Sequence, residues 1–330
     1  MKIAPTPKDE IFSEGTARLY RFRRPSDDVS EVPATRYPLL VVPSLINRWY
    51  ILDLLSGMSV VEACSQRLDT YLLDWGVPND EDRYLTWNHV LKRLARAVRR
   101  VKRATGSPKV SILGYCMGGT LSSIYTALHP DQVSALVNLA GPIDFSKGGR
   151  LQNMTDPRWF DVDAIVATGN LAAPQMQSGF TMLRPLLSIS KWVNYPDIAF
   201  DPAKKEHFEA MEQWASDNTP FPAAAYRTYI HDLYQNNALV NGSHRALGRA
   251  VDLAEITCPV LSIVASKDGI CPAPAATALN DAVSSKRTDV LEIRGGHVGA
   301  VVGPRASTTL YPGLVDWLMK NTARAPVALV

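Results

Sequence analysis

Short apolar runs alternate with longer amphipathic segments along most of the chain. Buried strands of a parallel sheet are typically short apolar runs that end in turn-forming residues, whereas the helices that cover the sheet have apolar positions at helical spacing. The pattern therefore predicts an α/β fold with a mostly parallel central sheet flanked by helices. The expected strands are residues 39–42, 70–73, 110–113, 135–139, 260–265 and 290–293.

One amphipathic segment, residues 88–106, lies between the second and third expected strands. Its apolar positions Leu91, Leu94 and Val98 recur at helical spacing, and Gly106 is placed to end the helix. The polar face is expected to be solvated, but it could also attract an anionic ligand or partner. This face carries seven basic residues, namely Lys92, Arg93, Arg96, Arg99, Arg100, Lys102 and Arg103.

The strand pattern stops in residues 147–247, which are rich in proline, methionine and aromatic residues. We expect a largely helical cap here, inserted into a core formed by residues 36–146 and 248–322. Residues 1–35 are predicted to be a polar, loosely ordered extension, and residues 323–330 a short tail. Aromatic side chains of the cap could exclude water from a site beneath it or simply form a second core, and they include Trp192, Tyr195, Trp214, Phe221 and Tyr226.

The composition is that of an ordinary globular protein, with 46% hydrophobic and 20% charged residues. The formal net charge of +3 gives no argument for nucleic-acid binding, so no nucleic-acid partner is expected. No run of about 18 apolar residues occurs, and the N-terminus has no apolar stretch of signal-peptide length, so we expect a cytoplasmic protein without a membrane span. Four widely spaced cysteines, without a CxxC pair or a histidine cluster, indicate neither a disulfide framework nor a metal site.

The sequence GYCMG at residues 114–118 stands between an expected strand and an expected helix. This is the G-x-nucleophile-x-G pattern of the α/β-hydrolase fold, in which the nucleophile occupies a tight strand-to-helix turn. The N-terminus of the helix favours a thiolate at Cys116, and the backbone N–H of Met117 can donate to an oxyanion. A second oxyanion donor is expected from the loop after an early strand, where the backbone N–H of Ile46 or Leu45 is the candidate.

A free cysteine is only slightly ionised at neutral pH, so efficient chemistry at Cys116 needs a base beside it. The chain order of this fold, nucleophile then acid then histidine, selects two residues. Asp268 follows the expected strand 260–265, and His297 follows the expected strand 290–293. Their separation, 297 − 268 = 29 residues, leaves room for one helix and one strand. We therefore predict that Asp268 orients His297 and that His297 is the general base toward Cys116.

Several motifs, in the same order, resemble the catalytic subunit of class III polyhydroxyalkanoate synthases over residues 37–318. By this resemblance the family's nucleophile falls on Cys116, its aspartate on Asp268 and its histidine on His297. In two places the chain departs from the family's usual pattern, because Gly269 replaces a histidine and Pro43 is followed by serine instead of a second proline. The matching stretches are PLLVVPSLINRWYILDL, DTYLLDWG, GYCMGGT, GPIDFS, YQNNALVNG, GRAVDLAEITCPVLSI and GGHVGAVVG.

The resemblance implies an acyltransferase that polymerises (R)-3-hydroxyacyl-CoA, with 3-hydroxybutyryl-CoA as the expected monomer, through an acyl-cysteine and with release of CoA. It also implies a polyester granule as the product surface, a separate accessory subunit and a homo-oligomer, and it implies no cofactor. The two departures leave open a second hypothesis, a cysteine-dependent esterase, thioesterase or polyester depolymerase. A non-catalytic, granule-associated homologue is a third. The first two hypotheses differ in the acceptor of the acyl group, which is a hydroxyl in one and water in the other.

Overall fold

The computed structural model describes residues 1–23, 37–183 and 195–322. Eight strands form one sheet in the order β1-β2-β6-β3-β7-β8-β11-β12. Neighbouring strands run parallel from β6 to β12, whereas β1 and β2 join antiparallel. The strands are β1 (Lys8–Glu14), β2 (Ala17–Phe22), β3 (Leu39–Val42), β6 (Thr70–Asp74), β7 (Val110–Tyr115), β8 (Val133–Leu139), β11 (Val260–Ala265) and β12 (Thr288–Ile293).

The predicted fold class and all six predicted strands are confirmed by this sheet. The predicted amphipathic helix is α2 (Trp87–Thr105), and it ends at Gly106, whose φ of 60° is left-handed. Five of these strands are almost entirely buried and α2 buries one face, so apolar runs and helical spacing predict them; β12 is buried only at Ile293.

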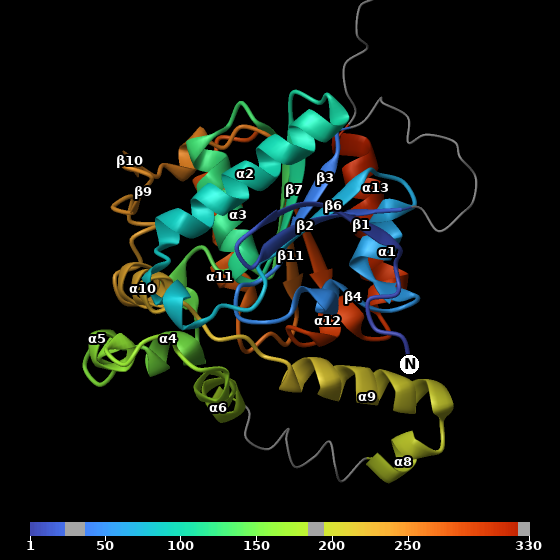
Figure 1. The fold of residues 1–330 in the computed structure, drawn as a ribbon. Coiled ribbons are helices and arrows are strands. Elements are labelled where there is room, and N and C mark those ends of the chain that lie inside the picture. Colours follow the sequence, from blue (N-terminus) through green and yellow to red (C-terminus); the bar gives the residue numbers. More distant parts are fainter. Residues whose placement is uncertain (24–36, 184–194, 323–330) are drawn as a thin grey trace, which may run out of the picture.

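Helices cover both faces of the sheet, with α2 and α3 on one face and α1 and α13 on the other (Figure 1). Alternate residues of β3 supply the two resulting cores, because Leu40 and Val42 face α2 and α3 whereas Leu39 and Val41 face the opposite layer. The core helices are α1 (Val60–Ser65), α2, α3 (Met117–Leu128), α11 (Ala273–Ala282), α12 (Gly299–Val302) and α13 (Tyr311–Asn321), and two short hairpins pair β4 (Asp53–Leu55) with β5 (Met58–Ser59) and β9 (Arg245–Ala246) with β10 (Arg249–Ala250).

The prediction of a loosely ordered extension is wrong for residues 8–22. These residues form the β1–β2 hairpin, and β2 extends the main sheet by pairing antiparallel with β6. In β2, Ala17, Leu19 and Phe22 are buried while Arg21 is exposed. A strand with one solvated face has no continuous apolar run, so a search for such runs does not find it. Residues 24–36 and the expected tail 323–330 lie outside the described residues.

Between β8 and β11 the described residues contain helices and no strand of the main sheet. Figure 1 shows several of these helices gathered at one end of the sheet. They contact the core through the loop after β3, where Asn47 pairs with Asn218 in an isolated bridge. The helices are α4 (Arg150–Met154), α5 (Val162–Val166), α6 (Ala173–Leu183), α8 (Tyr195–Ala199), α9 (Pro202–Ser216), α10 (Ala223–Thr228) and a π-helical turn (Tyr229–Gln235).

The turn between β7 and α3 packs directly against neighbouring backbone. A Cβ atom on Gly118 would lie 2.0 Å from the carbonyl oxygen of Val42, and one on Gly114 would lie 2.3 Å from the carbonyl oxygen of Gly118. Backbone oxygens of a central sheet cannot move aside as a flexible side chain can. The turn can therefore close only with glycine at these two positions.

Replacing Gly118 by alanine is expected to lower the free energy of unfolding by at least about 1–3 kcal/mol, because the added methyl group overpacks the β3–α3 contact. Gly179 is a matched control, since it lies inside α6 and a Cβ there would meet nothing within 4 Å. The same substitution at Gly179 should raise stability by about 0.4–1 kcal/mol. Urea denaturation of both variants measures the difference, and equal stabilities would contradict this account of the turn.

Candidate active site

Cys116 occupies the turn between β7 and α3. Its φ of 55° and ψ of −126° lie in a region that non-glycine residues rarely adopt. The turn is held by two backbone hydrogen bonds, one from the amide of Cys116 to the carbonyl of Leu139 (2.9 Å) and one from the amide of Gly119 to the carbonyl of Cys116 (2.8 Å). Strain of this kind persists only where surrounding structure imposes it, and it is typical of active sites. The side chain retains 9% of its exposure.

Asp268 and His297 meet as the sequence predicts. The imidazole Nδ1 donates to Asp268 Oδ2 at 2.7 Å, and the Asp268 side chain is fully buried. Asp268 Oδ1 accepts from the backbone amides of Ile270 and Cys271 at 2.8 and 2.9 Å. The carboxylate is thus fixed by the turn after β11, and its bond to Nδ1 leaves Nε2 as the ring nitrogen available to another partner.

The electrostatics of His297 depend on its two charged neighbours. Burial lowers the pKa of the imidazole, but the Cys116 thiolate and the Asp268 carboxylate outweigh this effect and raise the pKa to about 10. A buried imidazolium between two anions is the arrangement of a thiolate–imidazolium pair. The thiolate is the form of a cysteine that attacks an acyl group, so this arrangement suits a nucleophile.

Tyr115 is a residue that the sequence analysis did not select. Its ring stacks on the ring of His297, with 5.3 Å between the centroids and 28° between the planes. The Tyr115 hydroxyl is buried and has no hydrogen-bond partner among the described residues. Tyr115 therefore contacts the imidazole through ring packing. The one sequence signal was its place next to Cys116 in the motif.

Both candidate oxyanion donors lie beside Cys116, since Ile46, Met117 and Cys116 line one cavity. Met117 is the first residue of α3. The loop carrying Ile46 is tied to Thr219, whose hydroxyl donates to the carbonyl of Leu45 at 2.9 Å. In a trans peptide the N–H points opposite to the C=O, so the amide of Ile46 points away from Thr219. The oxyanion role of Ile46 and Met117 stays a prediction.

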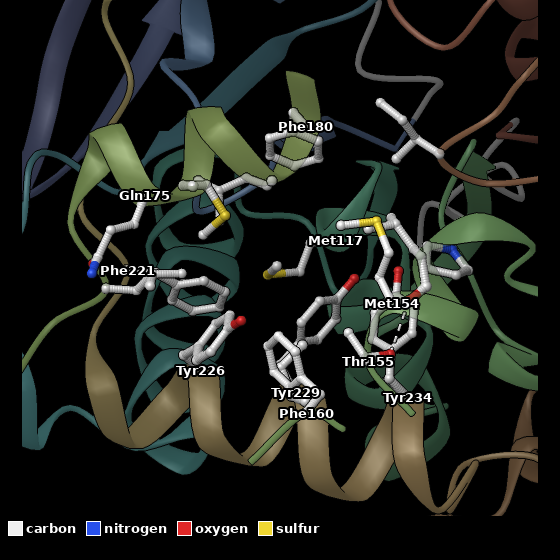
Figure 2. Close-up of a pocket in the computed structure, with 18 of the residues that line it drawn as sticks. Met117, Met154, Thr155, Phe160, Gln175, Phe180, Phe221, Tyr226, Tyr229 and Tyr234 are labelled. Carbon is white, nitrogen blue, oxygen red and sulfur yellow. Dashed lines mark hydrogen bonds between the residues drawn. The ribbon is translucent and has the colours of Figure 1, made fainter. Parts of the chain in front are cut away.

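A cavity of about 300 Å³ begins at Cys116 and extends under the helices that follow β8. Figure 2 shows Tyr226, Tyr229 and Tyr234 pointing into it from one side and Gln175 and Phe180 from the other. Burial raises the pKa of Tyr226 to about 12, so that hydroxyl is neutral at physiological pH. The apolar wall includes Leu151, Met154, Phe160, Ile165, Leu171, Met176, Phe221, Ile230 and Ile270.

A second, smaller cavity of about 150 Å³ also reaches Cys116, and His297 lines it. Its wall carries amide side chains, Asn47 and Asn218, in addition to Trp214. Cys116 is therefore placed where the two cavities meet. Of the cap aromatics expected from the sequence, Phe221 and Tyr226 line the first cavity and Trp214 the second, whereas Trp192 lies outside the described residues.

The other cysteines differ from Cys116 in their surroundings. Burial raises the pKa of Cys64 and of Cys258 to about 12, which keeps both thiols protonated. Cys271 lines the large cavity, but burial and the nearby Asp268 carboxylate raise its pKa well above the usual value. Within the described ranges, no three His, Cys, Asp or Glu side chains gather to hold a metal ion. None of the helices in that part of the chain is long and apolar enough to cross a membrane.

Comparison with known proteins shows which families this chain resembles. Residues 37–304 match the family model of the alpha/beta hydrolase fold. The structure is also similar to that of a hydrolase from Pseudomonas aeruginosa, with a TM-score of 0.57 over 94% of this chain and 98% of that chain. The two sequences are only 15% identical, so this likeness concerns the fold alone.

Two curated relatives are more similar to this chain in sequence than that hydrolase is. The chain is 37% identical to the poly(3-hydroxyalkanoate) polymerase subunit PhaC of Allochromatium vinosum, over 95% of this chain and 88% of that protein. It is 34% identical to the subunit of the same name from Synechocystis, over 97% of this chain and 86% of that protein. The chain therefore belongs to the α/β-hydrolase fold family and, within it, to the family of poly(3-hydroxyalkanoate) polymerase subunits.

Proposed function

We propose that this chain polymerises (R)-3-hydroxyacyl units from their CoA thioesters, with Cys116 as the residue that carries the acyl group. The observation that carries the proposal is the position of Cys116, on a strained turn beside the His297–Asp268 pair and at the mouth of a large apolar cavity. Membership of the polymerase family supports the same reaction. We further propose a cytoplasmic, granule-associated homo-oligomer that works with an accessory subunit.

The first half-reaction forms the acyl-enzyme. The Cys116 thiolate attacks the thioester carbonyl, and the resulting oxyanion accepts hydrogen bonds from the amides of Met117 and Ile46. Collapse of this intermediate breaks the bond to the CoA sulfur. The His297 imidazolium gives its Nε2 proton to the departing CoA thiolate, so CoA leaves as a thiol and His297 becomes neutral.

The second half-reaction transfers the acyl group. Neutral His297, held by Asp268, takes the proton from the hydroxyl of another 3-hydroxyacyl unit as that oxygen attacks the acyl-cysteine. An ester bond forms, the bond between the carbonyl carbon and sulfur breaks, and the thiolate–imidazolium pair is restored. The family resemblance also allows Asp268 to assist this deprotonation. The lengthened chain is then the CoA thioester of the attacking unit, and it acylates Cys116 again with release of CoA, so each cycle lengthens the polyester by one unit.

Hydrolysis of the same acyl-enzyme is the second candidate function. A hydroxyl competes with bulk water only if it is positioned and water is kept away. The large cavity, with walls that are almost entirely apolar, favours the hydroxyl of a hydroxyacyl chain. The smaller cavity is the place where water would compete, because it also reaches Cys116 and is lined by His297.

Product analysis tests the proposal directly. The chain is incubated with (R)-3-hydroxybutyryl-CoA, alone and with the accessory subunit of a class III synthase, and both CoA release and product are followed. Insoluble polyester is the expected product. Free 3-hydroxybutyrate in both conditions would replace the polymerase proposal by the hydrolytic one, and no release of CoA in either condition would overturn both.

Cys116→Ala is expected to abolish CoA release, since no other described thiol combines access to the cavity with a base. Cys258→Ala is the matched control, because it removes a thiol that lies outside both cavities, and it should retain full activity. Circular dichroism and the melting temperature verify that both variants are folded. Turnover by the Cys116 variant would contradict its assignment as nucleophile.

His297→Gln should slow alkylation of Cys116 by iodoacetamide and change its pH dependence. In the native chain the raised pKa of His297, about 10, keeps a positive charge beside the sulfur, so alkylation at pH 7 should be faster than in the variant. Without the imidazolium, the rate should rise with pH toward the pKa of an ordinary thiol, about 8.5. Peptide mapping of the alkylated cysteine over a pH series gives both profiles, and identical profiles would exclude the ion pair.

A further inference from the structure

The basic face of α2 forms a hollow together with the β1–β2 hairpin. Arg96, Arg99, Arg100 and Arg103 line this hollow with Phe12 of β1, and its volume is about 200 Å³. None of these residues lines either cavity at Cys116. The hollow is therefore separate from the candidate active site, and the proposed polymerisation does not use it.

The positive charge in the hollow is only partly balanced. Arg96 forms an ion pair with Glu14 of the hairpin. The guanidinium of Arg100 lies on the ring of Phe12, with its carbon 4.6 Å from the ring centroid. Within the described part of the chain, Arg99 and Arg103 are exposed and form no ion pair. Of the four arginines that line the hollow, only Arg96 is therefore paired with a carboxylate of the described residues.

Helix geometry forces these charges together. Arg96 and Arg99, Arg96 and Arg100, Arg99 and Arg103, and Arg100 and Arg103 are three or four positions apart, so each pair consists of neighbours on the helix surface. Like charges at this spacing destabilise a helix. An anion in the hollow would remove this repulsion, and no side chain of the described residues other than Glu14 supplies one.

A fifth arginine next to the hollow shows the same deficit of negative charge. Arg93 is half-buried, and its guanidinium lies close to Gly15, in the turn of the hairpin. Burial lowers the pKa of Arg93, and the charge of Asp82 acts in the opposite direction. Partial burial of a guanidinium without a paired anion is unfavourable, so this end of the hollow would also gain from a bound anion.

We propose that the hollow binds a compact polyphosphate group, such as the diphosphate of a small molecule. Arginine favours this chemistry, because its planar guanidinium donates two parallel hydrogen bonds to phosphate oxygens. The size of the hollow favours it too, since whole small-molecule sites usually measure about 300–1,000 Å³ and a smaller hollow suits a single charged group.

Calorimetric titration of the full chain with inorganic pyrophosphate tests the proposal. The titration is made at about 0.15 M salt, where the Debye length is about 8 Å and diffuse attraction is largely screened. The variant R99Q/R103Q removes two charges from the hollow. The control K92Q/K102Q removes two charges from the same helix outside the hollow, so the two variants have the same net charge.

Pyrophosphate is expected to bind the native chain and the control with dissociation constants within about twofold of each other. R99Q/R103Q should weaken binding at least about tenfold, which corresponds to the loss of one charge-assisted hydrogen bond. The melting temperatures without ligand verify that both variants fold, and R103Q alone replaces the double variant if the latter melts early. No binding by the native chain, or equal weakening in both double variants, would overturn the proposal.

Two further binding experiments test whether the hollow selects phosphate and whether that phosphate belongs to a lipid or to a soluble molecule. Sulfate at equal ionic strength should bind more weakly than pyrophosphate, because it cannot engage as many guanidinium groups at once; equal binding would show a general anion effect and overturn the proposal. Phosphatidylglycerol vesicles test a lipid headgroup. Vesicle binding that pyrophosphate displaces and that R99Q/R103Q loses would place the phosphate on a lipid, whereas its absence would place it on a soluble molecule.

Discussion

The close approach of the β7–α3 turn to β3 is the constraint on which the rest of the site depends. Gly118 lets the first turn of α3 lie against the carbonyl of Val42, and the amide of Cys116 is bonded to Leu139 of β8. These contacts with both neighbouring strands, β3 and β8, hold Cys116 in a backbone conformation that costs of order 1–3 kcal/mol. The backbone at Cys116 is therefore fixed, and the other functional groups lie on loops around it.

Loops at the carboxyl ends of other strands supply those groups. His297 and Asp268 follow β12 and β11, and Ile46 follows β3, so three separate parts of the sheet meet at Cys116. The pair of anions around His297 keeps the imidazole protonated despite burial. Cys116 also lines a mostly apolar cavity. A protonated base beside the thiol and an apolar cavity around it suit a reaction in which the acyl-enzyme persists until a hydroxyl attacks it and water is excluded.

How much could be predicted depended on whether a feature is local in the sequence. Five of the six parallel strands and α2 were predictable, because continuous apolar runs and helical spacing record their burial, whereas β12 is buried only at Ile293. The turn at Cys116 was predictable from a short motif, and the contact of Asp268 with His297 from their positions after expected strands; the catalytic roles of all three are proposals. The β1–β2 hairpin was not predictable, because Leu19 alternates with solvated neighbours. The stacking of Tyr115 on His297 and the bond from Thr219 to Leu45 join residues far apart in the chain, and no local pattern records them.

In the proposed reaction the acyl group on Cys116 passes to a hydroxyl rather than to water. Mass spectrometry of the enzyme, quenched at intervals after mixing with (R)-3-hydroxybutyryl-CoA, distinguishes these two fates. We expect an adduct on the peptide containing Cys116 that grows with time by whole 3-hydroxybutyryl units. An adduct that never exceeds one unit and decays to free 3-hydroxybutyrate, or an adduct on another residue, would contradict it.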